Sequence, residues 1–208
     1  RNDVIGSFAW DKDGTNNWTT AELNTNILNN LYLNSSTGTC NFYKTSVTKT
    51  CSFTKNGLKN VLDYIETATW NLGGSEYDKT AEVTYKTERG TTVKTSGTPI
   101  VTTAKVGLMY ASDYGYSVKN SSCNHSSTSL GSYNTTACGG NAWMLKNGFE
   151  WTLSPNSSNA SSVLFVISNA FVYSYNANNG FGVRPVLYLN SNVYITGGDG
   201  SINNPFQV

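Results

Sequence analysis

Charged side chains are scarce in this sequence. Lys, Arg, Asp and Glu make up 13% of its 208 residues, about half the usual share of a soluble domain, and their charges nearly cancel, leaving a net charge of +1. Lys and Arg are scattered along the chain, so the sequence lacks the basic stripe of a nucleic-acid-binding protein. Its polarity comes from Asn, Ser, Thr and Gly, a composition that favours a secreted or surface protein over a cytosolic enzyme.

Long apolar runs are absent as well. No stretch approaches the roughly 18 apolar residues of a membrane-spanning helix. No apolar leader precedes the first polar residues, which predicts that any export signal or membrane stem lay upstream. No segment rich in Pro or Gly divides the chain, so we expect a single domain over residues 1–208, large enough to fold without a metal.

Residues suited to catalysis are few. The single histidine, His125, lies in the polar segment NSSCNHSSTS, which predicts a solvated loop residue without a nucleophile or an acid beside it. Asp11 and Asp13 fit a turn better than a calcium loop, because the EF-hand spacing is missing. The glycines at 196–201 lack the strand-to-helix context of a phosphate loop. We therefore predict no catalytic residues, no metal and no cofactor.

The four cysteines form no CxxC pair, and one histidine is too few to complete a typical zinc site. The simplest of the three possible pairings joins Cys40 to Cys51 and Cys123 to Cys138, each closing a polar loop. The alternative is four reduced thiols in a cytosolic protein. We predict the two local disulfides, and with them an extracellular or cell-surface location.

Apolar spacing predicts two helices, followed by a C-terminal third that is rich in strands. The first helix follows a cap at Thr19 or Thr20 and presents one apolar face, consisting of Leu23, Ile27, Leu28 and Leu31. The second follows a cap at Asn56 and presents Leu58, Val61, Leu62 and Ile65. We expect a polar hairpin at 35–55, a helical turn at 81–89, a buried strand at 105–110, and further strands at 149–153, 163–175, 182–189 and 193–195. Helices first and strands later favour an α+β fold.

The strongest strand pattern predicts a hairpin at 163–175, centred on Asn169, with Phe165 opposite Tyr173. Alternation then puts a small aliphatic set on one face, consisting of Leu164, Val166, Val172 and Ser174. The other face carries an aromatic ladder, consisting of Phe165, Ile167, Phe171, Tyr173 and Tyr175. The pattern fits either an exposed ladder or a ladder that is itself part of the core, with the aliphatic face exposed or buried too.

Two motifs flank this hairpin, Trp151-Thr152-Leu153-Ser154-Pro155 and Gly182-Val183-Arg184-Pro185-Val186. They resemble the formylglycine-generating-enzyme type of C-type lectin fold, and more closely the variable proteins of diversity-generating retroelements and related bacterial surface and pilin-like proteins. Four earlier segments are similar too, so the resemblance covers most of the chain: NNWTTAELNTNILNNLYLNS, ATWNLGG, ERGTTV and VGLMYASDYGY.

The resemblance implies a C-type lectin-like domain with two helices, a small twisted antiparallel sheet and long loops. It also implies a variable, ligand-binding interval at about 156–181, which favours the exposed ladder. Enzymes of this fold use a cysteine pair for copper-dependent oxidation, but neither pair here falls on that motif, so that activity is not carried over. Arg184 is expected to pair with a carboxylate or carbonyl inside the fold.

We therefore predict a surface-displayed binding module that is not an enzyme. Its ligand would be a protein or a glycan, bound as antibody loops bind, by rigid aromatic rings and adaptable amides. The predicted ligand-binding residues are Phe165, Ile167, Asn169, Phe171, Tyr173, Tyr175, Asn178 and Phe181. The alternatives are a structural pilin-like subunit without its stem, as part of a pilus or surface assembly, and a metal-dependent enzyme of the same fold.

Overall fold

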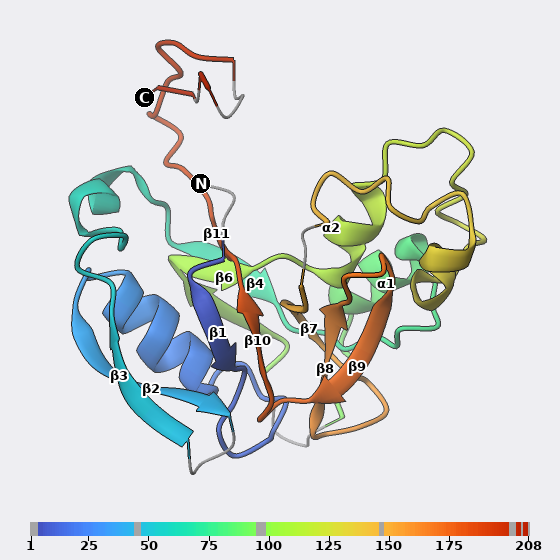
Figure 1. Ribbon diagram of the computed structural model, residues 1–208, viewed down its shortest axis with the longest axis horizontal. Helices are drawn as coiled ribbons and strands as arrows, with labels where there is room; N and C mark the ends of the chain where they lie inside the picture. Colours follow the sequence, from blue (N-terminus) through green and yellow to red (C-terminus); the bar gives the residue numbers. More distant parts are fainter. Residues whose placement is uncertain are drawn as a thin grey trace.

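A five-stranded mixed sheet, in the order β1-β10-β7-β8-β9, forms the centre of the fold (Figure 1). The computed structural model describes residues 4–43, 47–94, 99–145, 148–199, 203–204 and 206–207. Four of the five strands come from the C-terminal third, as the sequence predicts, and the architecture is α+β. The strands of this sheet are β1 (Gly6–Ala9), β7 (Glu150–Pro155), β8 (Ser162–Val166), β9 (Val172–Asn176) and β10 (Gly180–Val183).

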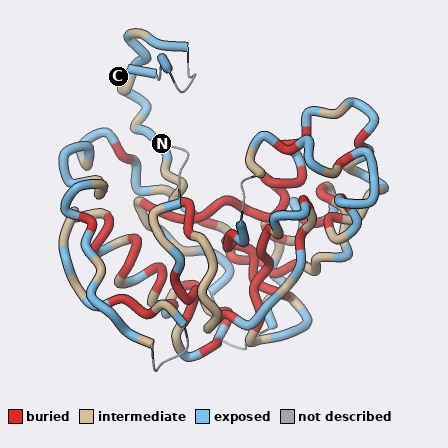
Figure 2. The backbone as a smooth tube through the Cα atoms, in the orientation of Figure 1, coloured by how far each residue is buried: buried red, intermediate tan, exposed pale blue. Residues whose placement is uncertain are grey.

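Three two-stranded ribbons and five helical segments surround the sheet. The ribbons pair β2 (Thr37–Tyr43) with β3 (Val47–Ser52), β4 (Ala68–Asn71) with β5 (Val101–Ala104), and β6 (Val106–Leu108) with β11 (Pro185–Leu187). The helical segments are η1 (Leu23–Tyr32), η2 (Lys59–Tyr64), α1 (Ala81–Glu88), α2 (Ala111–Tyr116) and η3 (Leu130–Thr135). Residues 188–190, just after β11, still pair with the end of η2 and the segment that follows it. The described residues beyond 190 extend away from the body of the domain and are largely exposed (Figures 1 and 2).

The first helix forms where predicted, but it has more residues per turn than an α-helix. Its hydrogen bonds reach back five residues, as from the Leu33 N–H to the Leu28 carbonyl, so η1 is a π-helix and not the α-helix that the spacing predicts. The predicted caps at Thr19 and Thr20 are wrong. The Asn17 side chain accepts the Thr19 N–H at 3.1 Å instead. The apolar residues at the predicted positions are nevertheless buried.

The second predicted helix is a short 3₁₀ segment, η2, without a side-chain cap, so the expected cap at Asn56 is wrong. No residue of η2 is buried, and Val61 is exposed. Ile65, just after η2, is the one member of its expected apolar face that is fully buried. The expected turn at 81–89 is confirmed as α1, which Thr80 caps by accepting the Val83 N–H. The expected strand at 193–195 does not form.

Two hydrophobic clusters lie on opposite faces of the sheet, and β8 contributes to both. Val163 and Phe165 belong to the cluster that includes η1 and the tryptophans Trp10 and Trp151. The alternate residues of β8, Leu164 and Val166, join Val172 in the other cluster, which includes residues of α1, α2 and η3. β8 is therefore buried on both faces.

Both predicted disulfides are confirmed. Cys40–Cys51 joins β2 to β3 across the predicted polar hairpin, and Cys123–Cys138 closes the long loop after α2. Cys138 is fully buried in the second cluster, so this bridge ties the loop to the core.

Residues of the flanking motifs and of the hairpin are buried in the core, among them Trp151, Leu153, Val166 and Val172. Val186 and the adjacent Leu187 are only half-buried, because β11 pairs with β6 alone in a two-stranded ribbon. Arg184 is buried and forms a salt bridge with Glu150, which confirms its structural role.

Candidate ligand-binding surface

The hairpin β8–β9 has the predicted register. Phe165 pairs with Tyr173 and Val163 with Tyr175, and the Ile167 N–H donates to the Phe171 carbonyl. The loop between them is Ser168-Asn169-Ala170, and Ala170 has a φ of 71°. A short turn that ends in a left-handed residue is a common way to close a three-residue hairpin. The turn therefore fixes which side chains of β9 lie opposite those of β8.

The predicted exposure of Phe165 is wrong. This ring is 4% exposed, because β8 lies between β7 and β9 and its aromatic face is covered by the first hydrophobic cluster. Phe171 is half-buried and packs against the second cluster, not beside the ladder. It lies between the left-handed Ala170 and the start of β9, where the alternation of a regular strand does not hold. The ladder is thus core at β8 and surface at β9.

Phe165 forms the floor of a group of five aromatic rings. Its centroid lies 4.6 Å from that of Phe181, 5.9 Å from Phe149, 6.2 Å from Tyr175 and 6.5 Å from Tyr173. These distances are typical of favourable aromatic contacts. We call these five residues the aromatic surface. The sequence places Phe149 only at the start of a strand, so its part in the surface was missed.

The outer rings of the aromatic surface reach solvent. Tyr173 is 41% exposed, and Tyr175 and Phe149 are each 48% exposed. Phe181 is half-buried between them and Phe165. A rigid row of aromatic rings is therefore presented over a buried floor.

The remaining predicted residues lie at the margins. Asn169 is exposed at the hairpin turn, one end of the hairpin, and Ile167 is half-buried against the first cluster. Asn178 is half-buried in the loop after β9, at the other end. Of the predicted ligand-binding residues, the structure therefore brings Tyr173, Tyr175 and Phe181 together and leaves Asn169 apart from them.

A hollow of about 580 Å³ adjoins Tyr173 and Tyr175. Its other walls come from Tyr43 at the end of β2 and from the Ser and Asn residues of β8, β9 and the following loop. That loop is ordered, since Asn176 Oδ1 accepts the Asn178 N–H at 3.2 Å and the Ala177 carbonyl accepts the Trp10 N–H at 2.9 Å. The lining carries no charged side chain among the described residues.

Tyr77, from the loop before α1, supports the outer side of β9. The centroids of Tyr77 and Tyr173 lie 4.5 Å apart. The neighbouring Tyr173 raises the pKa of Tyr77 above its ordinary value. The two tyrosines therefore extend the row of rings to the outer side of β9.

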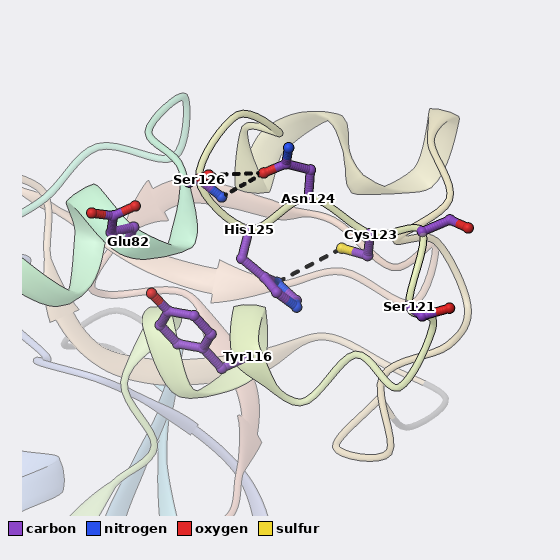
Figure 3. A pocket seen from close by; sticks show the side chains of 8 residues that line it. Glu82, Tyr116, Ser121, Cys123, Asn124, His125 and Ser126 are labelled. Atoms are coloured by element: carbon purple, nitrogen blue, oxygen red, sulfur yellow. Dashed lines mark hydrogen bonds between the residues drawn. The ribbon is translucent and has the colours of Figure 1, made fainter.

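A second hollow, of about 510 Å³, lies beside the loop that the Cys123–Cys138 bridge closes (Figure 3). His125 points into it between Tyr116 and Cys123, with its Nδ1 atom 3.7 Å from the Cys123 sulfur. This histidine is half-buried and packed, which corrects the prediction of a solvated residue. Because the sulfur is held in a disulfide, it is not available as a nucleophile.

Within the described ranges, no group of three or more His, Cys, Asp or Glu side chains is placed to hold a metal ion. The Asp11 carboxylate accepts hydrogen bonds from the Thr15 N–H and hydroxyl, as a turn residue does. Lack of enzymatic activity and of a cofactor stays a prediction.

Comparisons of the chain with protein-family models, with curated proteins and with solved structures found no match. The resemblance to C-type lectin-like variable proteins therefore stays a prediction. No helix in the described ranges has the length and apolar character to cross a membrane.

Proposed function

We propose that this protein is an extracellular binding module whose ligand lies on the aromatic surface. The observation that carries the proposal is the exposure of Tyr173 and Tyr175 on the edge strand β9, above the buried ring of Phe165. Large exposed rings grouped in one patch are uncommon on a monomer without a binding role. The disulfides support the location, since such bonds persist in oxidising compartments.

The rigidity of the surface supports a role in binding. Each exposed ring contacts a ring below or beside it, so little side-chain freedom remains to be lost when a ligand binds. Tyrosines supply apolar area with a hydroxyl at the tip, and the neighbouring amides supply adaptable donors and acceptors. Antibody paratopes combine the same residue types.

The neutral lining of the adjoining hollow favours a neutral ligand. Its Tyr, Ser and Asn side chains can stack on sugar rings and exchange hydrogen bonds with hydroxyls or peptide groups. No cation in the described lining would attract a phosphate backbone. The proposed ligand is therefore a glycan or an uncharged protein surface, not a nucleic acid.

The test is a binding screen with a matched pair of variants. The protein is screened against a glycan array and against surface proteins of neighbouring cells, and each hit is measured by surface plasmon resonance. We expect the double variant Tyr173→Ser, Tyr175→Ser to lose at least about tenfold in affinity, as central aromatic anchors do, while Tyr194→Ser keeps it. Tyr194 is 74% exposed and lies in the extended C-terminal segment. Unchanged affinity in the double variant would overturn the proposal.

A further inference from the structure

A third hollow opens between α2 and the segment that carries Trp143 and Met144. It shares no residue with the aromatic surface or with the hollow beside it. Its volume of about 360 Å³ lies in the range of roughly 300–1,000 Å³ that is typical of small-molecule sites. We call it the α2 pocket, and its principal walls are Met109, Asp113, Tyr116, Trp143, Met144 and Val186.

The α2 pocket combines one carboxylate with an otherwise mostly apolar lining. Asp113 lies in the first turn of α2, where its Oδ2 atom accepts the Tyr110 N–H at 2.9 Å. Burial raises the pKa of Asp113, because the carboxylate has lost part of its hydration. None of the salt bridges between described residues includes Asp113. The pocket therefore has an acidic group without an ion-pair partner in the described chain.

The two arginines near the pocket make their contacts elsewhere. Arg89 lowers the pKa of Asp113 from a distance, but its guanidinium lies over the Tyr85 ring, 3.6 Å from the centroid, with the Glu88 carboxyl beside it. Arg184 donates to the Met144 carbonyl and is neutralised by its salt bridge with Glu150. Neither arginine lines the pocket, and no Lys, Arg or His stands among the described residues of its walls.

Two exposed aromatic rings complete the pocket. Trp143 is 54% exposed and Tyr116 is 47% exposed. The face of an aromatic ring attracts a cation within about 6 Å, and the indole of tryptophan does so most strongly. The thioethers of Met109 and Met144 add a soft apolar wall that suits methyl groups.

We propose that the α2 pocket binds a small organic cation with a methylated ammonium group, of which choline is the simplest biological example. The N-methyl groups contact the rings of Trp143 and Tyr116, and Asp113 supplies the opposite charge. The apolar lining favours a methylated ammonium over a bare one, because an unmethylated ammonium would lose more hydration on entering. This site is independent of the aromatic surface, and each can fail without the other.

The chain contains its own reporter for the test. Four of the five tryptophans, Trp10, Trp18, Trp70 and Trp151, are at most 1% exposed, while Trp143 lies open at the pocket. Fluorescence that an external ligand quenches or shifts therefore reports mainly on Trp143. We titrate the protein with choline, with its neutral isostere 3,3-dimethylbutanol and with ethanolamine. We expect saturable binding of choline, and at least about tenfold weaker binding of the other two.

Two variants separate the contribution of the Asp113 charge to choline binding from that of the aromatic rings. Asp113→Asn keeps the size of the side chain and an acceptor for the Tyr110 N–H, and it should remove the preference for choline over the isostere. Trp143→Ala should abolish choline binding when this is followed by ligand-observed NMR, which needs no tryptophan. The control Tyr173→Ser should bind choline normally. If Asp113→Asn unfolds, the comparison of the three ligands on the unaltered protein, together with Trp143→Ala, still decides. Absence of saturable choline binding, or equal binding of the isostere, would overturn the proposal.

Discussion

The rings of Phe165 and Phe181 lie 4.6 Å apart between centroids and are inclined by 30°. Phe165 belongs to β8 and Phe181 to β10, two strands that β7 separates in the sheet. Their contact therefore crosses β7 on the face of the sheet and links the hairpin to the strand that pairs with the N-terminal β1. The aromatic surface is supported by this contact, so its floor and its exposed rings should respond differently to truncation.

Phe165→Ala should destabilise the protein by about 3–5 kcal/mol, because it leaves a cavity under four other rings. Tyr175→Ala, one strand away and half exposed, should cost only about 1 kcal/mol or less. Urea denaturation followed by circular dichroism measures both free energies of unfolding. Equal losses would mean that Phe165 is not the floor of the surface.

The two disulfides should be present in the native protein and should each matter for stability. Intact-mass measurement after alkylation should show four reactive thiols only when a reductant is added. Replacing either pair by alanines should lower the free energy of unfolding by about 3 kcal/mol, since the bridges close loops of similar length, 11 and 15 residues apart in sequence. Alkylation of the native protein without reductant would contradict the pairing.

Stability should fall as pH rises through neutrality because of Glu88. This carboxyl is buried where α1, α2 and β7 meet, with the Ser112 N–H at 3.2 Å and the hydroxyls of Ser112 and Ser154 bonded to it. Burial raises its pKa to about 7, against the opposing hydrogen bonds from the serines. The folded state therefore holds a proton that the unfolded state has released. The contribution is full below the unfolded pKa and is lost as pH rises through about 7.

Urea titrations between about pH 5 and pH 8 should show this loss, with a slope of at most about 1.4 kcal/mol per pH unit for one proton. Glu88→Gln should flatten the profile. The pKa of Asp113 is also raised by burial, so Asp113→Asn serves as the comparison and should leave the slope near pH 7 in place. A slope that persists in Glu88→Gln would assign it to another group.

The salt bridge between Arg184 and Glu150 should cost more to break than to replace. Both side chains are buried, and Arg184 also donates to the Met144 carbonyl at 2.9 Å. Arg184→Met alone leaves a buried carboxylate without its partner and should cost about 3–5 kcal/mol. Adding Glu150→Leu should recover much of that loss. A double-mutant cycle in urea tests this, and simple additivity would contradict it.

The register of the hairpin could be predicted because it depends only on neighbouring residues. The period of two and the short turn at Asn169 determine which residues pair, and the structure agrees. The buried face could not be deduced from alternation, because Val163, Leu164, Phe165 and Val166 are all apolar. Such an unbroken run is typical of a strand covered on both faces. This apolar run was the feature of the sequence that indicated a buried position for Phe165.

The rest of the candidate surface depends on contacts between distant segments. Phe149 and Phe181 join Phe165 from other strands, Tyr77 reaches Tyr173 from the loop before α1, and Tyr43 comes from a disulfide-bonded ribbon. No local pattern in one sequence reports such contacts. The same holds for the α2 pocket, where Trp143 and Asp113 are brought together by the fold of a long loop.

The pairing of β1 with β10 has a consequence for how the chain acquires its structure. Phe8 lies opposite Phe181, so the first strand of the sheet finds its partner only after all the residues between them have been made. Contacts between such distant residues must close a very long loop, and proteins dominated by them fold slowly. During synthesis, β1 therefore stays without its partner strand until β10 has been made. Removing either β1 or the segment around Phe181 should prevent the sheet from closing, so shortened versions of the domain are poor substitutes for it in binding experiments.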